Sequence, residues 1–277
     1  MSSIALPKKI EFTKGELPDQ GIVTIEPCYP GYGITFGNAL RRVLLSSLAG
    51  AAVVGVKIKG ASHEFMSIPH VKEDVLEIIL NLKLLRLKIF SDEVVKLELD
   101  VHGEKEVKAG DIKSNSEVEI VNSELTLAHI TDMAGNLQME IYVSRGKGYE
   151  TVENREKKNS EIGYIEIDSI FTPILNVGIN VDNVRVGKMT NWDRLSLHIL
   201  TDGTILPEDA FKQSVDILIE QFKALVGKED VVVEESHDII MGIEEEKAPI
   251  EESAENVMIM DDKKEETKKR RGRPKKS

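Results

Sequence analysis

The sequence predicts an α+β fold that is followed by a disordered acidic linker and a basic tail. Apolar and polar residues alternate repeatedly within the first 228 positions, which indicates antiparallel strands, whereas three other segments carry apolar residues at helical spacing. Neither pattern continues beyond Lys228. With 277 residues, of which 41% are hydrophobic, the chain has room for about two folded domains.

The alternating segments are predicted to be strands, because successive side chains of a strand point to opposite faces of a sheet. In the segment from Val54 to Ile58, apolar residues alternate with Gly55 and Lys57. The same signal occurs at Leu97–Val101, Val118–Ile120, Met139–Val143, Ile165–Ile167 and Leu195–Ile199.

Two amphipathic helices are expected in the first third of the chain. The first covers about residues 36–48, with Thr35 as its N-cap and an apolar stripe of Leu40, Val43, Leu44 and Leu48. The second covers residues 71–83 and carries Glu73 and Asp74 in its first turn, where the helix dipole favours anions. Its buried face is expected to contain Val71, Val75, Ile78, Ile79 and Leu82.

The third predicted helix starts at Pro207, which the first turn of a helix tolerates, and ends at Gly227. Its apolar residues recur at helical spacing: Phe211, Val215, Leu218, Ile219, Phe222, Leu225 and Val226. From this pattern alone, the helix is either an ordinary core helix or part of a dimer interface.

Composition excludes several classes of protein. The only cysteine is Cys28, so an intramolecular disulfide and a cysteine-rich metal site are excluded, which fits a reducing cytoplasm. The N-terminus lacks the features of a signal peptide. The longest charge-free stretch, 14 residues from Val43 to Val56, is too short for a membrane span of about 20 residues. The histidines lack metal-site spacing and no serine lies in a nucleophile elbow, so no metal, cofactor or catalytic residue is expected.

One glycine-rich turn suggests an alternative function. Gly31, Gly33 and Gly37 follow a predicted strand and open a helix, as in dinucleotide-binding proteins, in which a pyrophosphate lies at the helix N-terminus. The third glycine comes one residue late, and no acidic residue follows at the expected distance. A nucleotide-binding enzyme is therefore the alternative, and a structural turn is the favoured interpretation.

Charge is distributed unevenly along the chain, whose net charge is −12. Residues 229–267 contain fifteen acidic and three basic residues, and residues 268–277 contain seven basic residues and no acid. The acidic body argues against nonspecific nucleic-acid binding by the folded part. In the tail, Arg271-Gly272-Arg273-Pro274 resembles an AT-hook, whose arginines reach the floor of an A·T minor groove. The alternatives are a generic basic tail and, for the whole chain, an independent DNA-binding regulator.

Four longer motifs carry a resemblance to a known family. They are the run from Glu26 to Lys83, which contains GITFGNALRRVLLSSLAG, then RGKGY from Arg145, IDSIFTPILNVGINVDNVRVG from Ile167, and TDGTILPEDAF from Thr201. In this order they resemble bacterial RNA polymerase α subunits over about residues 5–228. The sequence departs from the family at Leu206, where an aspartate is usual, and in lacking the C-terminal DNA-binding domain.

The resemblance implies a fold and a function. Residues 1–52 and 178–228 would form a discontinuous dimerisation domain, and residues 53–177 a β-rich domain inserted into it. Residues 229–267 would be the acidic linker and 268–277 the AT-hook-like tail. The chain would be a cytoplasmic subunit of DNA-directed RNA polymerase, a nucleotidyltransferase complex, without catalytic residues of its own. It would act as a homodimeric scaffold on which the β and β′ subunits assemble, and the tail is the candidate for DNA contact.

The resemblance also assigns roles to individual residues. Arg42 matches a position that supports binding of the β subunit, and Arg41 is its neighbour. Lys83, Ile167 and Asp168 match positions implicated in β′ binding. The candidates for the dimer interface lie on the first and third predicted helices and are Leu40, Leu44, Phe211, Ile219 and Phe222.

Overall fold

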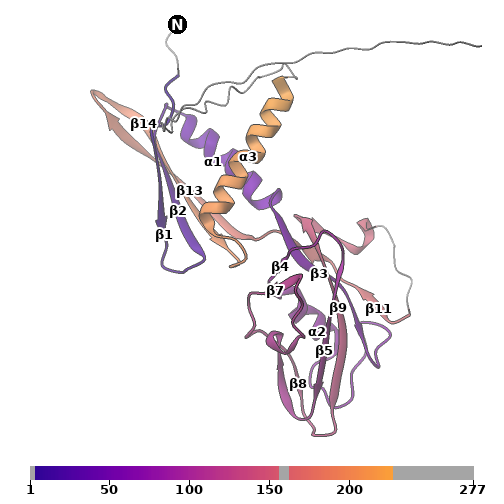
Figure 1. Ribbon diagram of the computed structural model, residues 1–277. Coiled ribbons are helices and arrows are strands. Elements are labelled where there is room, and N and C mark those ends of the chain that lie inside the picture. Colours follow the sequence, from indigo (N-terminus) through magenta and orange to yellow (C-terminus); the bar gives the residue numbers. More distant parts are fainter. Residues whose placement is uncertain (1–3, 156–161, 227–277) are drawn as a thin grey trace, which may run out of the picture. The chain divides into compact units, whose positions relative to one another are not determined.

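The computed structural model describes residues 4–155 and 162–226, all of which belong to one unit of the chain, Met1–Glu229. Within these ranges three α-helices accompany sheets of antiparallel strands, which confirms the predicted α+β class (Figure 1). No helix in the described ranges is long and apolar enough to cross a membrane.

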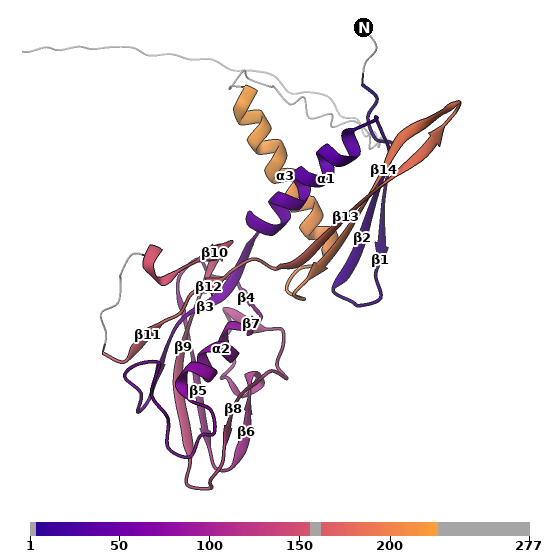
Figure 2. The same cartoon turned by 180° about the vertical axis from the view of Figure 1, so that it is seen from behind.

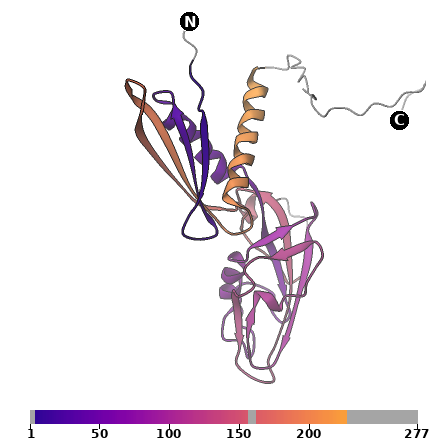
Figure 3. The same ribbon diagram turned by 60° about the vertical axis from the view of Figure 1, so that its left-hand side comes forward.

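The first sheet joins strands from both ends of the described chain. Its antiparallel order is β1-β2-β14-β13, and the strands are β1 (Lys9–Lys14), β2 (Gln20–Cys28), β14 (Met189–Thr201) and β13 (Ile174–Val186). Helices α1 (Tyr32–Ser46) and α3 (Pro207–Val226) pack on it: α1 contacts β13 and β14, and α3 contacts α1 and β2 (Figure 3).

Helix α1 approaches this sheet closely because two glycines lie on its buried face. A Cβ atom at Gly37 would be 3.0 Å from Cγ2 of Ile179 and 3.1 Å from Cδ1 of Leu195. Gly33 occupies the same face one turn earlier and is also buried. Leu40 and Leu44 continue this face, so the glycine-rich segment is a helix–sheet packing surface.

The expected start of α1 was wrong. The helix begins at Tyr32, and its N-cap is Gly31, which has a left-handed backbone with φ of 86°. Thr35 lies inside the first turn, where its hydroxyl donates to the carbonyl of Gly31 at 3.2 Å. Glycine tolerates this backbone conformation without strain, and so the helix starts before the threonine.

The second sheet has the order β11-β3-β9-β5 and is covered on one face by α2 (Val75–Lys83) (Figure 2). Its strands are β11 (Tyr164–Glu166), β3 (Ala49–Ile58), β9 (Asn136–Lys147) and β5 (Val95–His102). Burial alternates along β5 as its sequence predicts, with Leu97 and Leu99 buried and Glu98 exposed between them.

Helix α2 is shorter than expected. Asp74 is its N-cap and accepts a hydrogen bond from the amide of Glu77 at 2.8 Å. Val71 lies before the helix and forms an isolated bridge with Ile130 instead. The aspartate ends the preceding extended segment, because its side chain satisfies a free amide of the first turn.

Short ribbons and 3₁₀ turns complete the described chain. Strand pairs are β4 (Leu87–Ile89) with β7 (Val118–Ile120), β6 (Lys105–Lys108) with β8 (Thr126–Ile130), and β10 (Tyr149–Glu150) with β12 (Ser169–Ile170). The 3₁₀ turns are η1 (Ala109–Asp111) and η2 (Val152–Asn154).

The buried apolar residues form two large clusters that use different parts of the chain. One contains residues between Val23 and Leu48 together with residues between Ile174 and Phe211. The other contains residues between Val53 and Ile167. A small third cluster consists of Ala52, Val54 and Phe171.

Candidate functional site

The N-terminus of α1 is occupied by a side chain of the protein itself. The Oδ2 atom of Asp193, on β14, accepts hydrogen bonds from the amides of Gly31 at 2.9 Å and Gly33 at 3.0 Å. Asp193 is only 8% exposed. These are the amides that a pyrophosphate would bind in a nucleotide site, and the carboxylate already neutralises them. The structure therefore argues against the nucleotide-binding alternative at this turn.

Two adjacent arginines lie on the surface of α1. Arg41 and Arg42 are both exposed, and neither guanidinium has an ion-pair partner among the described residues. They follow the buried Leu40, so the helix is anchored to its sheet by one face while the two charges point away from the core. Two uncompensated guanidinium groups on a rigid helix are suited to binding carboxylates of a protein partner.

Helix α3 changes from buried to exposed along its length. Phe211 is 6% exposed and contacts Phe12 edge to face, with ring centroids 5.6 Å apart. Later apolar side chains are exposed: Ile219 by 44%, Phe222 by 59%, and Leu225 and Val226 by 81% each. The C-terminal half of the described helix thus presents an apolar row, Ile219, Phe222, Leu225 and Val226, that no described part of the chain covers.

This distribution divides the five predicted interface residues by their exposure within the protomer. Leu40, Leu44 and Phe211 are covered within the protomer and support the packing of α1 and α3 on the sheet. Helical spacing identifies an apolar face but cannot say which chain covers it. Ile219 and Phe222 remain as exposed candidates.

The candidate β′ residues come together from distant parts of the sequence. Lys83 is the last residue of α2, and its Nζ lies 3.7 Å from Oδ2 of Asp168, which connects β11 to β12. Both side chains are partly exposed. Ile167 differs, since it is 2% exposed and its amide donates to the carbonyl of Val54 at 3.0 Å. Ile167 therefore anchors the Lys83–Asp168 patch and does not form its surface.

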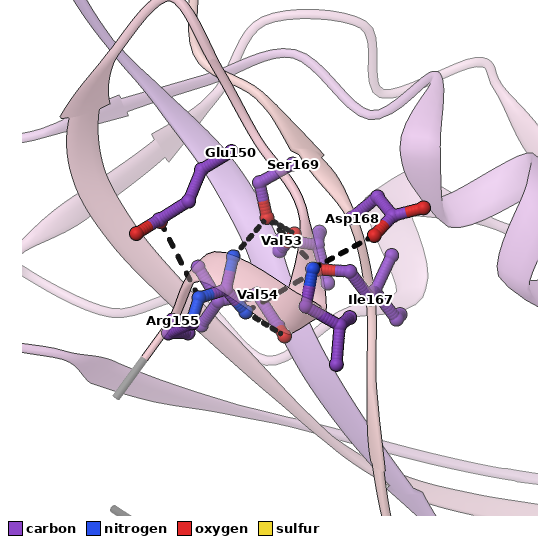
Figure 4. A network of polar contacts seen from close by, with 8 residues as sticks. Val53, Val54, Glu150, Arg155, Ile167, Asp168 and Ser169 are labelled. Carbon is purple, nitrogen blue, oxygen red and sulfur yellow. Dashed lines mark hydrogen bonds and ion pairs between the residues drawn. The ribbon is translucent and has the colours of Figure 1, made fainter. Parts of the chain in front are cut away.

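A hydrogen-bond network surrounds the backbone next to this patch (Figure 4). The Arg155 guanidinium donates to the carbonyls of Val54 at 2.8 Å and Ile167 at 3.3 Å, and to the hydroxyl of Ser169 at 3.0 Å. It also bonds to the carboxylate of Glu150 at 3.3 Å. Sequence analysis missed Arg155, Ser169 and Glu150, because their spacing carries no periodic signal; the position of Ser169 beside Asp168 was the only available indication.

Two titratable side chains have altered proton affinities for structural reasons. Burial and the nearby Asp193 carboxylate raise the pKa of the Cys28 thiol, which keeps it protonated. Burial alone would raise the pKa of Glu73, but hydrogen bonds from the amide and ring of His129 outweigh it and lower that pKa. In the part of the chain that the structure describes, no group of three or more metal-ligating side chains is arranged to hold an ion.

The tail motif Arg271-Gly272-Arg273-Pro274 and the acidic segment before it lie outside the described residues. The predicted AT-hook is therefore a feature of the sequence only.

Comparison with curated proteins identifies relatives over most of the chain. A protein of Desulforamulus reducens is 45% identical over 247 residues, which cover 89% of this chain and 77% of the relative. A protein of Syntrophomonas wolfei is 48% identical over 235 residues, covering 84% and 73%. Both are named DNA-directed RNA polymerase subunit alpha. The chain belongs to the family of bacterial RNA polymerase α subunits.

A third relative and a family model agree with this membership. The RNA polymerase α subunit of Carboxydothermus hydrogenoformans is 47% identical over 213 residues, which are 76% of this chain and 68% of the relative. Residues 56–172 match the model of the RNA polymerase Rpb3/RpoA insert domain. The matched range holds most of the second sheet and α2. As a member of the α-subunit family, the chain functions in transcription by DNA-directed RNA polymerase.

Proposed function

We propose that this polymerase subunit is a homodimeric scaffold that binds the β and β′ subunits in the cytoplasm. The observation that carries the proposal is the exposed apolar row on α3, where each large side chain that a partner covers fully contributes roughly 1.5–3 kcal/mol. We further propose a dimerisation domain of residues 1–52 and 178–228 with residues 53–177 inserted. The two large hydrophobic clusters support a division of this kind, although Ile174 and Val177 pack in the cluster of the first domain.

The dimer is tested by placing a charge in the apolar row. Phe222→Glu and Ile219→Glu are expected to give monomers in sedimentation velocity while far-UV circular dichroism stays unchanged, because burying a carboxylate in an interface is costly. Gln221→Glu is the matched control, since it adds the same charge at an exposed position of the same helix. A folded dimer of both variants with the wild-type dissociation constant would place the interface elsewhere.

Arg42 is proposed to bind the β subunit, with Arg41 beside it. The arginines are exposed and have no ion-pair partner among residues 4–155 and 162–226, so their guanidinium groups are available to carboxylates of a partner. Arg42→Ala is expected to weaken capture of β by about 2–5 kcal/mol if the pair is buried on binding, and to leave dimerisation intact. Capture of β at wild-type strength in physiological salt would exclude this role.

The Lys83–Asp168 patch is proposed to bind β′. A homodimer presents every patch twice, whereas β and β′ are different chains. Each copy of the α subunit would therefore use one of its two patches, and binding of the large subunits would break the symmetry of the dimer. Asp168→Ala is expected to weaken capture of β′ by a preformed complex of α subunits with β, without affecting capture of β. Equal loss of both subunits would contradict two separate patches.

The basic tail is proposed to contact A·T-rich DNA. The support is the order Arg271-Gly272-Arg273-Pro274 in the sequence and the membership of the chain in a transcription complex.

A further inference from the structure

Arg155 connects two parts of the chain that are distant in sequence, strand β3 and the segment from Ile167 to Ser169. Its side chain is 18% exposed, and it bonds to Val54 on β3, 101 residues away, and to Ile167 and Ser169 beside Asp168. The Ser169 hydroxyl extends the connection, since it donates to the carbonyl of Val53 at 2.7 Å. Figure 4 shows the guanidinium between these groups.

The point of attachment on β3 is a bulge. The pairing of β3 with β9 passes from Val53 directly to Gly55, so Val54 is the extra residue. Its carbonyl accepts two hydrogen bonds, from the amide of Ile167 at 3.0 Å and from Arg155 at 2.8 Å. Bulges of this kind redirect a strand and occur frequently next to functional sites.

The network reaches the Asp168 carboxylate by two routes. One is the backbone, because Arg155 holds the carbonyl of Ile167, the residue before Asp168. The other is η2: Arg155 caps the C-terminal end of this turn, and the amide of Val152 at its start donates to Oδ1 of Asp168 at 2.9 Å. Asp168 is thus held on one oxygen and leaves the other facing Lys83.

The ion pair with Lys83 cannot fix the orientation of the Asp168 carboxylate by itself. Its atoms are 3.7 Å apart and both side chains are about a third exposed, and pairs of this kind contribute little. The orientation of the carboxylate therefore depends on Val152 and on the backbone that Arg155 holds. A guanidinium suits the task, since it has five donors in a fixed planar arrangement, whereas a lysine has a single nitrogen.

We propose that Arg155 is a positioning residue for the Lys83–Asp168 patch, which orients Asp168 for recognition by the large subunit β′. The proposal rests on the function proposed above for that patch. Arg155 itself need not touch the partner. Its loss should release η2 and the Ile167–Ser169 backbone, so that the carboxylate no longer has one defined position.

The experiment measures capture of β′ by a preformed complex of the full-length chain with β. Arg155→Ala is expected to weaken capture by about tenfold, with dimerisation and capture of β unchanged. Arg155→Lys should recover little, although it keeps the charge. Lys113→Ala is the matched control, because it removes an equal charge from an exposed pair with Glu98 and should behave as wild type.

Two further measurements separate positioning from general destabilisation. In a double-mutant cycle, Arg155→Ala should weaken capture no further in an Asp168→Ala background. Hydrogen exchange of the Val152 amide should accelerate in Arg155→Ala, while amides of β5 exchange as in wild type. Additive losses, an unchanged Val152 amide, full recovery by lysine, or parallel losses of dimerisation and β capture would each overturn the proposal.

The cycle also distinguishes this proposal from the function on which it rests. If Asp168→Ala weakens capture and Arg155→Ala does not, the patch binds β′ and Arg155 does not position it. If Asp168→Ala captures β′ as well as wild type does, the proposed role of the patch fails, and the positioning role fails with it.

Discussion

Removal of the Asp193 side chain should destabilise the protein strongly. The carboxylate accepts two amide hydrogen bonds at the start of α1 and is 8% exposed, so water cannot replace it easily. Leaving a buried donor unsatisfied costs about 1–3 kcal/mol, and loss of an N-cap typically costs about 1 kcal/mol. Asp193→Ala leaves the amides of Gly31 and Gly33 without an acceptor, and the cost of the two unsatisfied donors overlaps with the cost of losing the cap. The substitution should therefore lower the free energy of unfolding by about 3 kcal/mol. That is a large part of the roughly 5–15 kcal/mol of an ordinary domain.

The assay is urea unfolding followed by circular dichroism, with Asp193→Asn as the matched control. Asparagine keeps one acceptor oxygen for the two amides, replaces the other oxygen with an NH2 group and loses the charge, whose interaction with the helix dipole is worth about 0.3–1 kcal/mol. The alanine variant should therefore be clearly less stable than the asparagine variant. If alanine costs under about 1 kcal/mol, or if both variants lose the same amount, hydrogen bonding to α1 is not the reason that Asp193 is buried there.

Three other predictions follow from separate parts of the chain. Gly37→Ala should destabilise the protein by about 1–3 kcal/mol in the same assay, because the new methyl group would press on the sheet; a neutral or stabilising effect would contradict close packing there. Because the pKa of Glu73 is lowered in the folded state, its contribution is present above its ordinary value of 4.5 and is lost as the pH falls through the lower folded value. The stability difference between wild type and Glu73→Gln should therefore shrink in acid, and a difference independent of pH would refute the bond to His129. For the tail, Arg271→Ala with Arg273→Ala should abolish preference for A·T-rich over G·C-rich duplexes, and a scrambled tail of equal charge should keep the salt dependence but not the preference; equal discrimination by the scrambled tail would leave only a basic patch.

Local sequence patterns determined much of the fold. Alternation along Leu97–Val101 corresponds to β5, and the apolar spacing after Pro207 corresponds to α3, because the side-chain period is a property of the backbone itself. The long motifs determined the family, since they extend through both clusters of buried residues. Exact ends were less predictable: the glycine at position 31 and the carboxylate of Asp74 set the starts of the first two helices.

Tertiary structure decided which residues are free to act. Periodicity showed that Leu44 and Phe222 lie on apolar faces of helices. Only the packing shows that Leu44 is buried within the protomer and that Phe222 is exposed. The contacts that order the candidate site join residues far apart in sequence, as with the Asp193 cap, 162 residues from Gly31, and the Arg155 bond to Val54, 101 residues away. Such contacts leave no periodic trace, because they depend on how separate strands meet in space and not on the spacing of residues along one of them.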